Sequence, residues 1–217
     1  VADRYGIVTV QAEDEIAAVC MAIGASFAGV RAMTATSGGG FSLMTEALGL
    51  AGMTEVPLVV VDAQRGGPST GLPTRTEQAD LLFAIHASQG EFPRIVLAPG
   101  NIPECFHLTA KAFNLAEKYQ TPVIILTDQF LAGSLQTIDL SAIDFSSVII
   151  DRGKLLTDED LRRISNGYSR FLLTPDGVSP RAAPGQPKVV HSVSSDEHDI
   201  DGNITEEIEI RQVMMEK

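Results

Sequence analysis

The sequence predicts an α/β fold, a parallel sheet with helices on both faces, and three observations support this. Short apolar runs recur along the first 130 or so residues: Ile7–Val10, Ala32–Thr36, Leu58–Val61, Ile95–Ala98 and Val123–Leu126. They are apolar at successive positions, as strands covered on both faces must be. Segments with the period of a helix separate them. This alternation is typical of βαβ units.

The first helical segment follows the run at Ile7–Val10. Its apolar residues recur at the spacing of one helix face: Ile16, Val19, Cys20, Ile23 and Phe27. The second segment, Phe41–Met53, is apolar almost all round, so we expect it to be buried beneath another subunit or domain.

A further helix is expected after Pro103, a residue favoured in the first turn. Its apolar face contains four residues: Phe106, Thr109, Ala110 and Phe113. Beyond about Ser134, proline, glycine, serine and acidic residues dominate, and the segment Thr205–Lys217 has a charged, helical pattern. We therefore expect an α/β domain at 1–134 and an extended C-terminal arm or linker at 135–217.

Composition narrows the class of protein. The 217 residues, 44% of them hydrophobic, suffice for one core and a small appendage. A net charge of −12 would repel a phosphate backbone, which argues against nucleic acid as a partner. Neither a run of about 18 apolar residues nor a basic leader is visible. The sequence thus predicts a cytoplasmic protein with no membrane segment.

The cysteines and histidines show no pattern of a metal site. Cys20 and Cys105 are far apart and fall among helical apolar positions, so we expect two buried thiols. The four histidines lack ligand spacing and a nucleophilic partner, and are expected to be surface or core residues: His86, His107, His191 and His198.

Ligands of such sheets meet the loops at the carboxyl ends of the strands. The first of these loops holds three successive acids, Glu13, Asp14 and Glu15, which either only begin a helix or include one working acid. The next, Ser37–Gly40, joins a strand to a helix, and its glycines would let an anion or a ring approach the backbone. Tight turns also need glycine, so this motif alone is unspecific.

The loop from Asp62 to Gln78 is the most unusual connection. It is long, has no apolar period and carries two arginines, which is more typical of a functional loop than of filler. Arg65 directly follows a buried strand, where its guanidinium could bind a carboxylate through two parallel hydrogen bonds. A salt bridge to a neighbouring acid is the structural alternative.

Three motifs in order resemble the α subunit of the 2-oxoacid:ferredoxin oxidoreductases, of the 2-oxoglutarate type. They are QAEDEIAA at 11–18, TATSGGGFSLM at 34–44 and QRGGPSTGLPTRTEQ at 64–78. The resemblance extends through the arm, with DRGK at 151–154 and SPRA at 179–182. The family usually has Ser-Gly-Pro-Gly where this chain has Ser37-Gly38-Gly39-Gly40, which should loosen the turn.

The resemblance implies the pyrimidine-type domain of a thiamine-diphosphate enzyme. It assigns Glu13 as the carboxyl group that hydrogen-bonds to N1′ of the aminopyrimidine ring, with Asp14 and Glu15 as helix-start charges. Further cofactor-binding residues are implied in the glycine motif: Thr36, Ser37, Gly38 and Phe41. Arg65 becomes the candidate for the substrate carboxylate, with Arg75 and Gln78 as weaker candidates on the same loop.

The implied reaction is the oxidative decarboxylation of a 2-oxoacid to an acyl-coenzyme A, with electrons passed to ferredoxin. Mg²⁺, the diphosphate site and the iron–sulfur cluster are expected on a partner β subunit, within a homodimer of α chains or an α–β hetero-oligomer. Family members also have a further strand and a Tyr-Pro-Ile-Thr-Pro loop before this point, and a further α/β domain after the arm.

Two alternatives remain open at the level of sequence. One is another half of a thiamine-diphosphate enzyme, a decarboxylase or a transketolase-like protein, against which the 65–78 loop argues. The other is a non-catalytic module for subunit assembly. Which 2-oxoacid is used depends on the shape of the pocket, which the sequence does not reveal.

Overall fold

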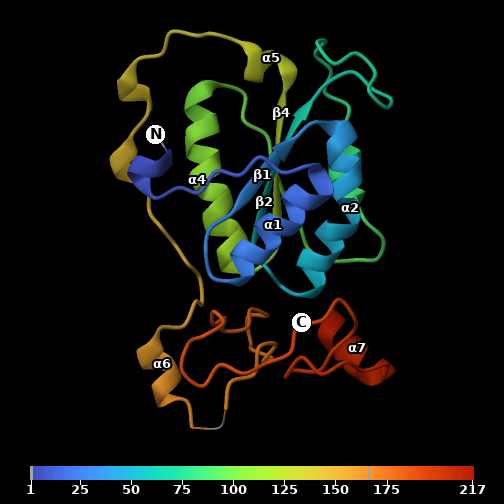
Figure 1. The fold of residues 1–217 in the computed structure, drawn as a ribbon, viewed down its shortest axis with the longest axis vertical. Coiled ribbons are helices and arrows are strands. Elements are labelled where there is room, and N and C mark those ends of the chain that lie inside the picture. Colours follow the sequence, from blue (N-terminus) through green and yellow to red (C-terminus); the bar gives the residue numbers. More distant parts are fainter. Residues whose placement is uncertain (1, 166) are drawn as a thin grey trace.

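The computed structural model describes residues 2–165 and 167–217, and its centre is a four-stranded parallel sheet (Figure 1). The strands are β1 (Met33–Thr36), β2 (Leu58–Gln64), β3 (Ile95–Leu97) and β4 (Pro122–Asp128), in the order β1-β2-β4-β3. Thr36 is level with Asp62, and Gln64 with Asp128. The carboxyl ends of β1, β2 and β4 therefore meet at one edge of the sheet.

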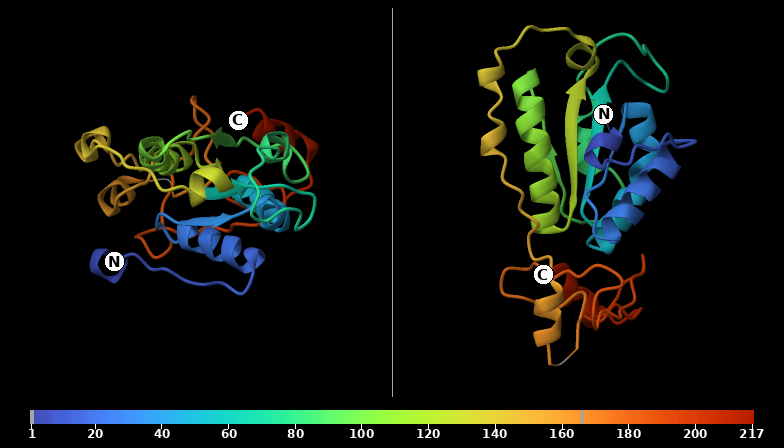
Figure 2. Two further views of the ribbon diagram at one scale, coloured as in Figure 1. Left: turned by 90° about the horizontal axis from the view of Figure 1, so that it is seen from above. Right: turned by 60° about the vertical axis from the view of Figure 1, so that its left-hand side comes forward.

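Helices cover both faces, as the apolar strands predict. On one face lie α1 (Glu15–Phe27), α2 (Gly38–Met53) and the short α3 (Leu81–His86); on the other lies α4 (Ile102–Tyr119) (Figure 2, right). Side chains of β2 alternate between the two cores, with Leu58 and Val60 facing α1 and α2, and Val59 facing α4. The expected α/β class is confirmed.

Local signals set the ends of the helices. Asp14 caps α1 by accepting a hydrogen bond from the backbone N–H of Ala17 at 2.7 Å. Asn101 does the same for α4, whose first turn contains Pro103, and Gln120 ends that helix in the left-handed conformation. Helix α2 has its buried face against the sheet, while Leu43 on its outer side is exposed, so burial beneath another subunit stays a prediction.

The run Ile7–Val10 is not a strand, and here the prediction from sequence is wrong. These residues form no part of the sheet, and their apolar side chains are exposed, with Val8 at 86%. They follow a short 3₁₀ turn, η1 (Ala2–Tyr5). An apolar run becomes a strand only where a neighbour takes up its backbone hydrogen bonds, and none of the four strands pairs with it.

The expectation of two buried thiols is also wrong. Cys20 is exposed and Cys105 only half-buried, and both thiols are free. The buried face of α1 consists of Val19, Ala22, Ile23 and Ser26, so Cys20 lies beside the apolar stripe rather than within it. Periodicity located the helix but not its exact rotation.

The C-terminal part runs along the outside of α4 and then folds beneath the sheet (Figures 1 and 2). After α5 (Gln129–Gly133) come two 3₁₀ turns, η2 (Leu140–Ala142) and η3 (Phe145–Ser147). Residues 151–217 hold α6 (Asp158–Arg163), α7 (Ile208–Met215) and a small apolar cluster of Leu161, Tyr168 and Ala182. This unit packs at the amino ends of the strands, away from the ligand edge. The segment predicted as an extended arm thus includes a folded unit at 151–217 with helices and an apolar cluster of its own.

Candidate functional site

A cavity of about 570 Å³ opens at the carboxyl ends of β1 and β2. It is formed by the first turn of α1, the first turns of α2, the loop after β2 and the start of α3. Its lining consists of Glu15, Ser37, Gly38, Gly39, Gly40, Ser42, Leu43, Arg65, Gly66, Gly67, Pro68, Ser69, Thr70, Asp80 and Phe83. Two of the three loops with family motifs contribute most of these residues.

The glycines that open α2 are required by close approach rather than by φ. A Cβ on Gly40 would lie 2.5 Å from Oε1 of Glu15, and one on Gly38 would lie 2.5 Å from Oδ2 of Asp80. A Cβ on Gly39 would meet only Ser69 O, at 3.6 Å. Two carboxyl groups therefore lie directly against the backbone of this turn, where any larger residue would displace them.

Glu15 is the carboxyl group that the structure brings to the mouth of α2. It is half-buried in the first turn of α1, where a negative charge is favoured. The hydroxyl of Thr36 donates a hydrogen bond to Oε1 of Glu15 at 3.4 Å. A carboxylate, a hydroxyl and bare glycine backbone thus border one side of the cavity.

Asp62 and Asp80 form a second acidic feature. Asp62 is fully buried at the carboxyl end of β2, and burial with the neighbouring charge of Asp80 raises its pKa to about 7. Burial also raises the pKa of Asp80. Gln64 fixes Asp80, because its Oε1 accepts a hydrogen bond from the Asp80 backbone N–H at 3.0 Å.

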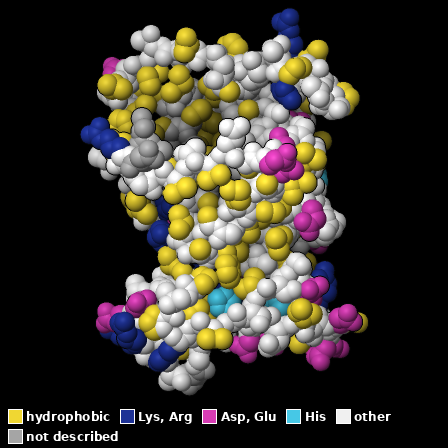
Figure 3. Space-filling model, viewed as in Figure 1, with side chains coloured by type: hydrophobic (Ala, Val, Ile, Leu, Met, Phe, Trp, Pro, Cys, Tyr) yellow, Lys and Arg dark blue, Asp and Glu magenta, His cyan; other side chains and the backbone are white. Residues whose placement is uncertain are grey.

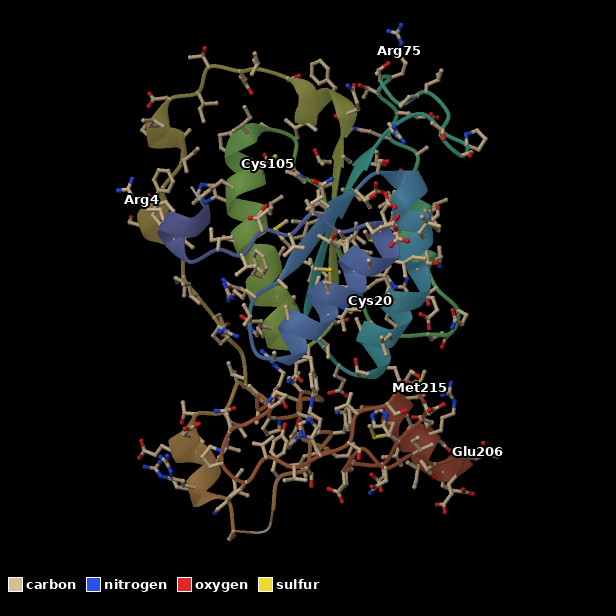
Figure 4. The ribbon with its side chains drawn as sticks, viewed as in Figure 1. Arg4, Cys20, Arg75, Cys105, Glu206 and Met215 are labelled. Carbon is tan, nitrogen blue, oxygen red and sulfur yellow. The ribbon has the colours of Figure 1, made fainter. Side chains whose placement is uncertain are left out.

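The loop after β2 is closed by its own backbone. The N–H of Gly66 donates to the carbonyl of Arg75 at 3.1 Å, and the N–H of Leu72 donates to the carbonyl of Gly66 at 2.8 Å. The Gly67–Pro68 peptide bond is cis. Arg65, half-buried, lines the cavity from the base of this loop, whereas Arg75 is exposed at its outer tip (Figure 4).

Of the other predicted site residues, some line the cavity and one is buried in the core. Ser37 and Gly38 line the cavity. Thr36 does not line it, but its hydroxyl donates a hydrogen bond to Glu15, which does. Phe41 is fully buried in the core, with its ring edge-on to Phe83 at 5.2 Å between centroids. Phe83 in turn lines the cavity.

Glu13 and Gln78 lie elsewhere. Glu13 is exposed and is not among the lining residues. Gln78 donates a hydrogen bond through Nε2 to Oδ2 of Asp128 at 2.5 Å, toward the end of β4. The structure therefore brings together Ser37, Gly38 and Arg65, and leaves Glu13, Arg75 and Gln78 outside the cavity lining.

From the sequence, Glu15 is one of three candidate acids and the resemblance makes it only a helix-start charge, while Asp62, Asp80 and Phe83 have no predicted site role. A signal existed for Asp62, because an acid that ends a fully apolar strand must be partnered or neutral once buried. None existed for Asp80 and Phe83, whose approach to α2 depends on how the long loop folds. Within the parts of the chain that the structure describes, no group of three or more His, Cys, Asp or Glu side chains is placed to hold a metal ion.

No helix among the described residues combines the length and apolar character that a membrane crossing needs. The charged side chains are numerous around the C-terminal unit, while hydrophobic ones are spread over the face that carries α1 (Figure 3).

Comparison with known proteins bears out the resemblance. The profile of the family described as pyruvate flavodoxin/ferredoxin oxidoreductase, thiamine diphosphate-binding, matches residues 1–217. The chain is 53% identical over 211 residues to the α subunit of 2-oxoacid:ferredoxin oxidoreductase 1 of Sulfurisphaera tokodaii, covering 97% of this chain and 32% of that protein. It is 55% identical over 129 residues to the 2-oxoglutarate oxidoreductase subunit KorA of Mycobacterium tuberculosis, covering 59% of this chain and 20% of that one.

The fold has a solved counterpart. The 2-oxoglutarate:ferredoxin oxidoreductase from Magnetococcus marinus, solved with 2-oxoglutarate, coenzyme A and succinyl-CoA bound, superimposes with a TM-score of 0.87 at 42% identity. The match covers 98% of this chain and 36% of that chain. The chain thus spans about a third of the length of the first relatives it matches.

Proposed function

Because the chain belongs to the pyruvate flavodoxin/ferredoxin oxidoreductase family, in its thiamine-diphosphate-binding part, we propose that it is the α-subunit part of a 2-oxoacid:ferredoxin oxidoreductase. The reaction takes a 2-oxoacid anion, coenzyme A and two oxidised ferredoxins to an acyl-coenzyme A, carbon dioxide, a proton and two reduced ferredoxins. The relatives named as 2-oxoacid and 2-oxoglutarate enzymes support this substrate class.

One observation carries the proposal: a carboxylate, Glu15, lies against the glycine turn of α2 at the carboxyl edge of the sheet. The absence of Cβ atoms at Gly38 and Gly40 lets the carboxyl groups of Asp80 and Glu15 lie against this turn at the cavity, where the Glu15 carboxyl group can share a proton with a ring nitrogen. These residues fit the aminopyrimidine end of thiamine diphosphate. When bound, this cofactor supplies the carbon nucleophile that attacks the 2-oxo carbon and lets carbon dioxide leave.

The chain's own residues have three tasks in this scheme. A carboxyl group holds or moves a proton at N1′ of the aminopyrimidine; the family resemblance assigns Glu13 to this task, and the geometry favours Glu15. Arg65, at the base of the loop after β2, binds the carboxylate of the 2-oxoacid by paired hydrogen bonds. Phe83 and Leu43 supply apolar walls that reduce contact with water.

The rest of the machinery is proposed to lie on a partner β subunit: the diphosphate site with its Mg²⁺ and the iron–sulfur cluster. The α-subunit names of the relatives support a multi-subunit assembly. An exposed apolar surface on and before α1, including Val8, Val10 and Met21, is compatible with a partner that covers it. The two free thiols are compatible with the reducing cytoplasm in which we propose the complex works.

The test compares Glu13→Gln with Glu15→Gln in the intact complex. Loss of the working carboxyl group removes the proton at N1′, so turnover with saturating thiamine diphosphate should fall by a factor of at least about 100. Asp14→Asn is the matched control, because Asp14 only caps α1 and should cost no more than about 2 kcal/mol of stability.

The Glu15 assignment predicts that Glu15→Gln is the inactive variant and that Glu13→Gln is active. The reverse result assigns the role to Glu13, as the resemblance implies. Near-normal turnover in both variants, measured as 2-oxoacid-dependent ferredoxin reduction, would overturn the proposed site.

A further inference from the structure

Asp62 is buried under conditions that an ionised carboxylate does not tolerate. It is fully buried beside the α1–α2 core, and neither of its oxygens receives a hydrogen bond from a protein donor. The described part of the chain has no cationic side chain that forms an ion pair with Asp62 or with Asp80. A buried carboxylate without a donor or a counter-ion is strongly unfavourable, so Asp62 must be satisfied in another way.

The neighbour of Asp62 is another acid. Asp80 is the N-cap residue of α3, yet its side chain makes no capping hydrogen bond. It interacts instead with Asp62, since each of the two carboxyl groups shifts the pKa of the other. Oδ2 of Asp80 is buried and also lacks a donor. The backbone bond to Gln64 keeps Asp80 in this position.

Two neighbouring carboxylates repel each other when both are ionised, whereas one shared proton satisfies both. The surroundings place that proton on Asp62, which is the more deeply buried group. From the neighbouring elements, Glu77 on the loop adds negative charge to Asp80, and Glu15 of α1 and Arg65 line the same cavity. The strand neighbours of Asp62, Thr36 and Leu126, carry no titratable group.

We propose that Asp62 and Asp80 form a proton-sharing carboxyl pair, in which Asp62 donates a hydrogen bond to Oδ2 of Asp80. This bond orients Asp80 so that its second carboxyl oxygen accepts a hydrogen bond from an N–H group of a bound amino-substituted ring. Asp80 lines the cavity beside Gly38, and a Cβ on Gly38 would lie 2.5 Å from Oδ2 of Asp80. Asp62 is then a positioning residue. The ring in question rests on the proposed function, but the shared proton does not.

The shared proton is tested by infrared spectroscopy on the intact protein without any ligand. A protonated carboxyl group has a C=O stretch separate from that of carboxylates, and this band should vanish as the pH rises through about 7. Asp62→Asn should abolish the band. Asp128→Asn is the matched control, because Asp128 is also buried at the same edge but accepts hydrogen bonds from Gln78 and Leu131. A band that persists in Asp62→Asn overturns the proposal.

Loss of the Asp62 proton should destabilise the folded protein as the pH rises. Since the folded-state pKa of Asp62 is raised from 3.8 to about 7, the folded protein holds a proton that the unfolded chain releases. The stability of the wild type should therefore fall, relative to Asp62→Asn, as the pH rises from about 4 to about 7, and the difference should then level off. Parallel curves for the two proteins would contradict a shared proton.

The positioning role is tested by the affinity of the intact complex for thiamine diphosphate. The amide of Asp62→Asn can still donate to Asp80, so the affinity should stay within about threefold, whereas Asp62→Leu has no donor and should bind about tenfold more weakly or worse. Equal affinity in both variants overturns the positioning role. A wild-type complex that binds no thiamine diphosphate overturns the proposed function instead, and leaves the infrared result standing.

Discussion

At the scale of single residues, Arg65 and Arg75 illustrate how one loop places two equal charges in different surroundings. Arg65 lies at the base of the loop, half-buried in the cavity wall, while Arg75 projects from its tip (Figure 4). A guanidinium gains most from a bidentate carboxylate partner where water is partly excluded. Only Arg65 meets this condition, so it is the stronger candidate for the substrate carboxylate.

Arg65→Lys should lower the apparent substrate affinity of the intact complex by one to two orders of magnitude. The lysine keeps the charge but loses the paired geometry, and each charge-assisted hydrogen bond is worth roughly 1.5–3 kcal/mol. The measurement is KM for a series of 2-oxoacids, with cofactor affinity expected to change little. Arg75→Lys is the control and should leave KM unchanged. An unaltered KM in Arg65→Lys would mean that the carboxylate is bound elsewhere.

At the scale of elements, the first turn of α2 is where the carboxyl groups of Glu15 and Asp80 come together. Its N-cap residue, Ser37, makes no side-chain capping bond, so the backbone N–H groups of the turn are free of that partner. The glycines allow Glu15 from α1 and Asp80 from the α3 side to approach the same turn from two directions. A helix start that lacks side chains is therefore what makes the cavity.

Gly40→Ala should cost roughly 1–3 kcal/mol of stability, because the new Cβ collides with Thr36 and Glu15. It should also reduce turnover, since Glu15 is pushed from its position. Gly39→Ala is a matched control one residue away, with only an ordinary 3.6 Å contact for its Cβ. Thermal denaturation and turnover of both variants check this prediction. Indistinguishable variants would show that the turn tolerates the methyl group by moving.

At the scale of the whole molecule, one carboxylate joins the C-terminal unit to the α/β domain. Glu117 of α4, only 4% exposed, forms ion pairs with Arg31, Arg152 and Arg181 at 2.6, 2.5 and 3.2 Å between the paired atoms. Arg31 precedes β1, and the other two belong to the C-terminal unit. A second buried arginine of that unit, Arg170, pairs with Glu55 at 3.4 Å. These contacts lie at the amino ends of the strands, far from the cavity.

Glu117→Gln should destabilise the protein by roughly 3–5 kcal/mol, because it leaves three partly buried guanidinium groups without their shared partner. Cleavage in the C-terminal unit by a protease should become faster, which limited proteolysis measures. Glu159→Gln, which removes only the exposed pair with Arg163 on α6, should change stability by no more than about 0.5 kcal/mol. Equal resistance of the two variants would mean that apolar packing alone holds the unit.

Much of the fold and part of the site could be predicted from sequence. Four of the five apolar runs are strands, and the two central ones, β2 and β4, are buried along most of their length, as their continuous apolar sequences predict. The glycine motif and Arg65 were recognised because a strand's end fixes which loop meets the ligand edge. The same reasoning failed for Ile7–Val10, since a strand needs a hydrogen-bonded neighbour that periodicity cannot supply.

The sequence by itself determined the α/β class, the order of the elements and the family, because these depend on periodicity and on short motifs. Only the tertiary structure decided which acids lie together. Asp62 and Asp80 are separated by the long loop, and Glu15 of α1 lies against the first turn of α2, its neighbour on the same face of the sheet. Contacts of this kind are made by chain segments far apart in sequence, and the pKa of a buried acid depends on such neighbours rather than on adjacent residues.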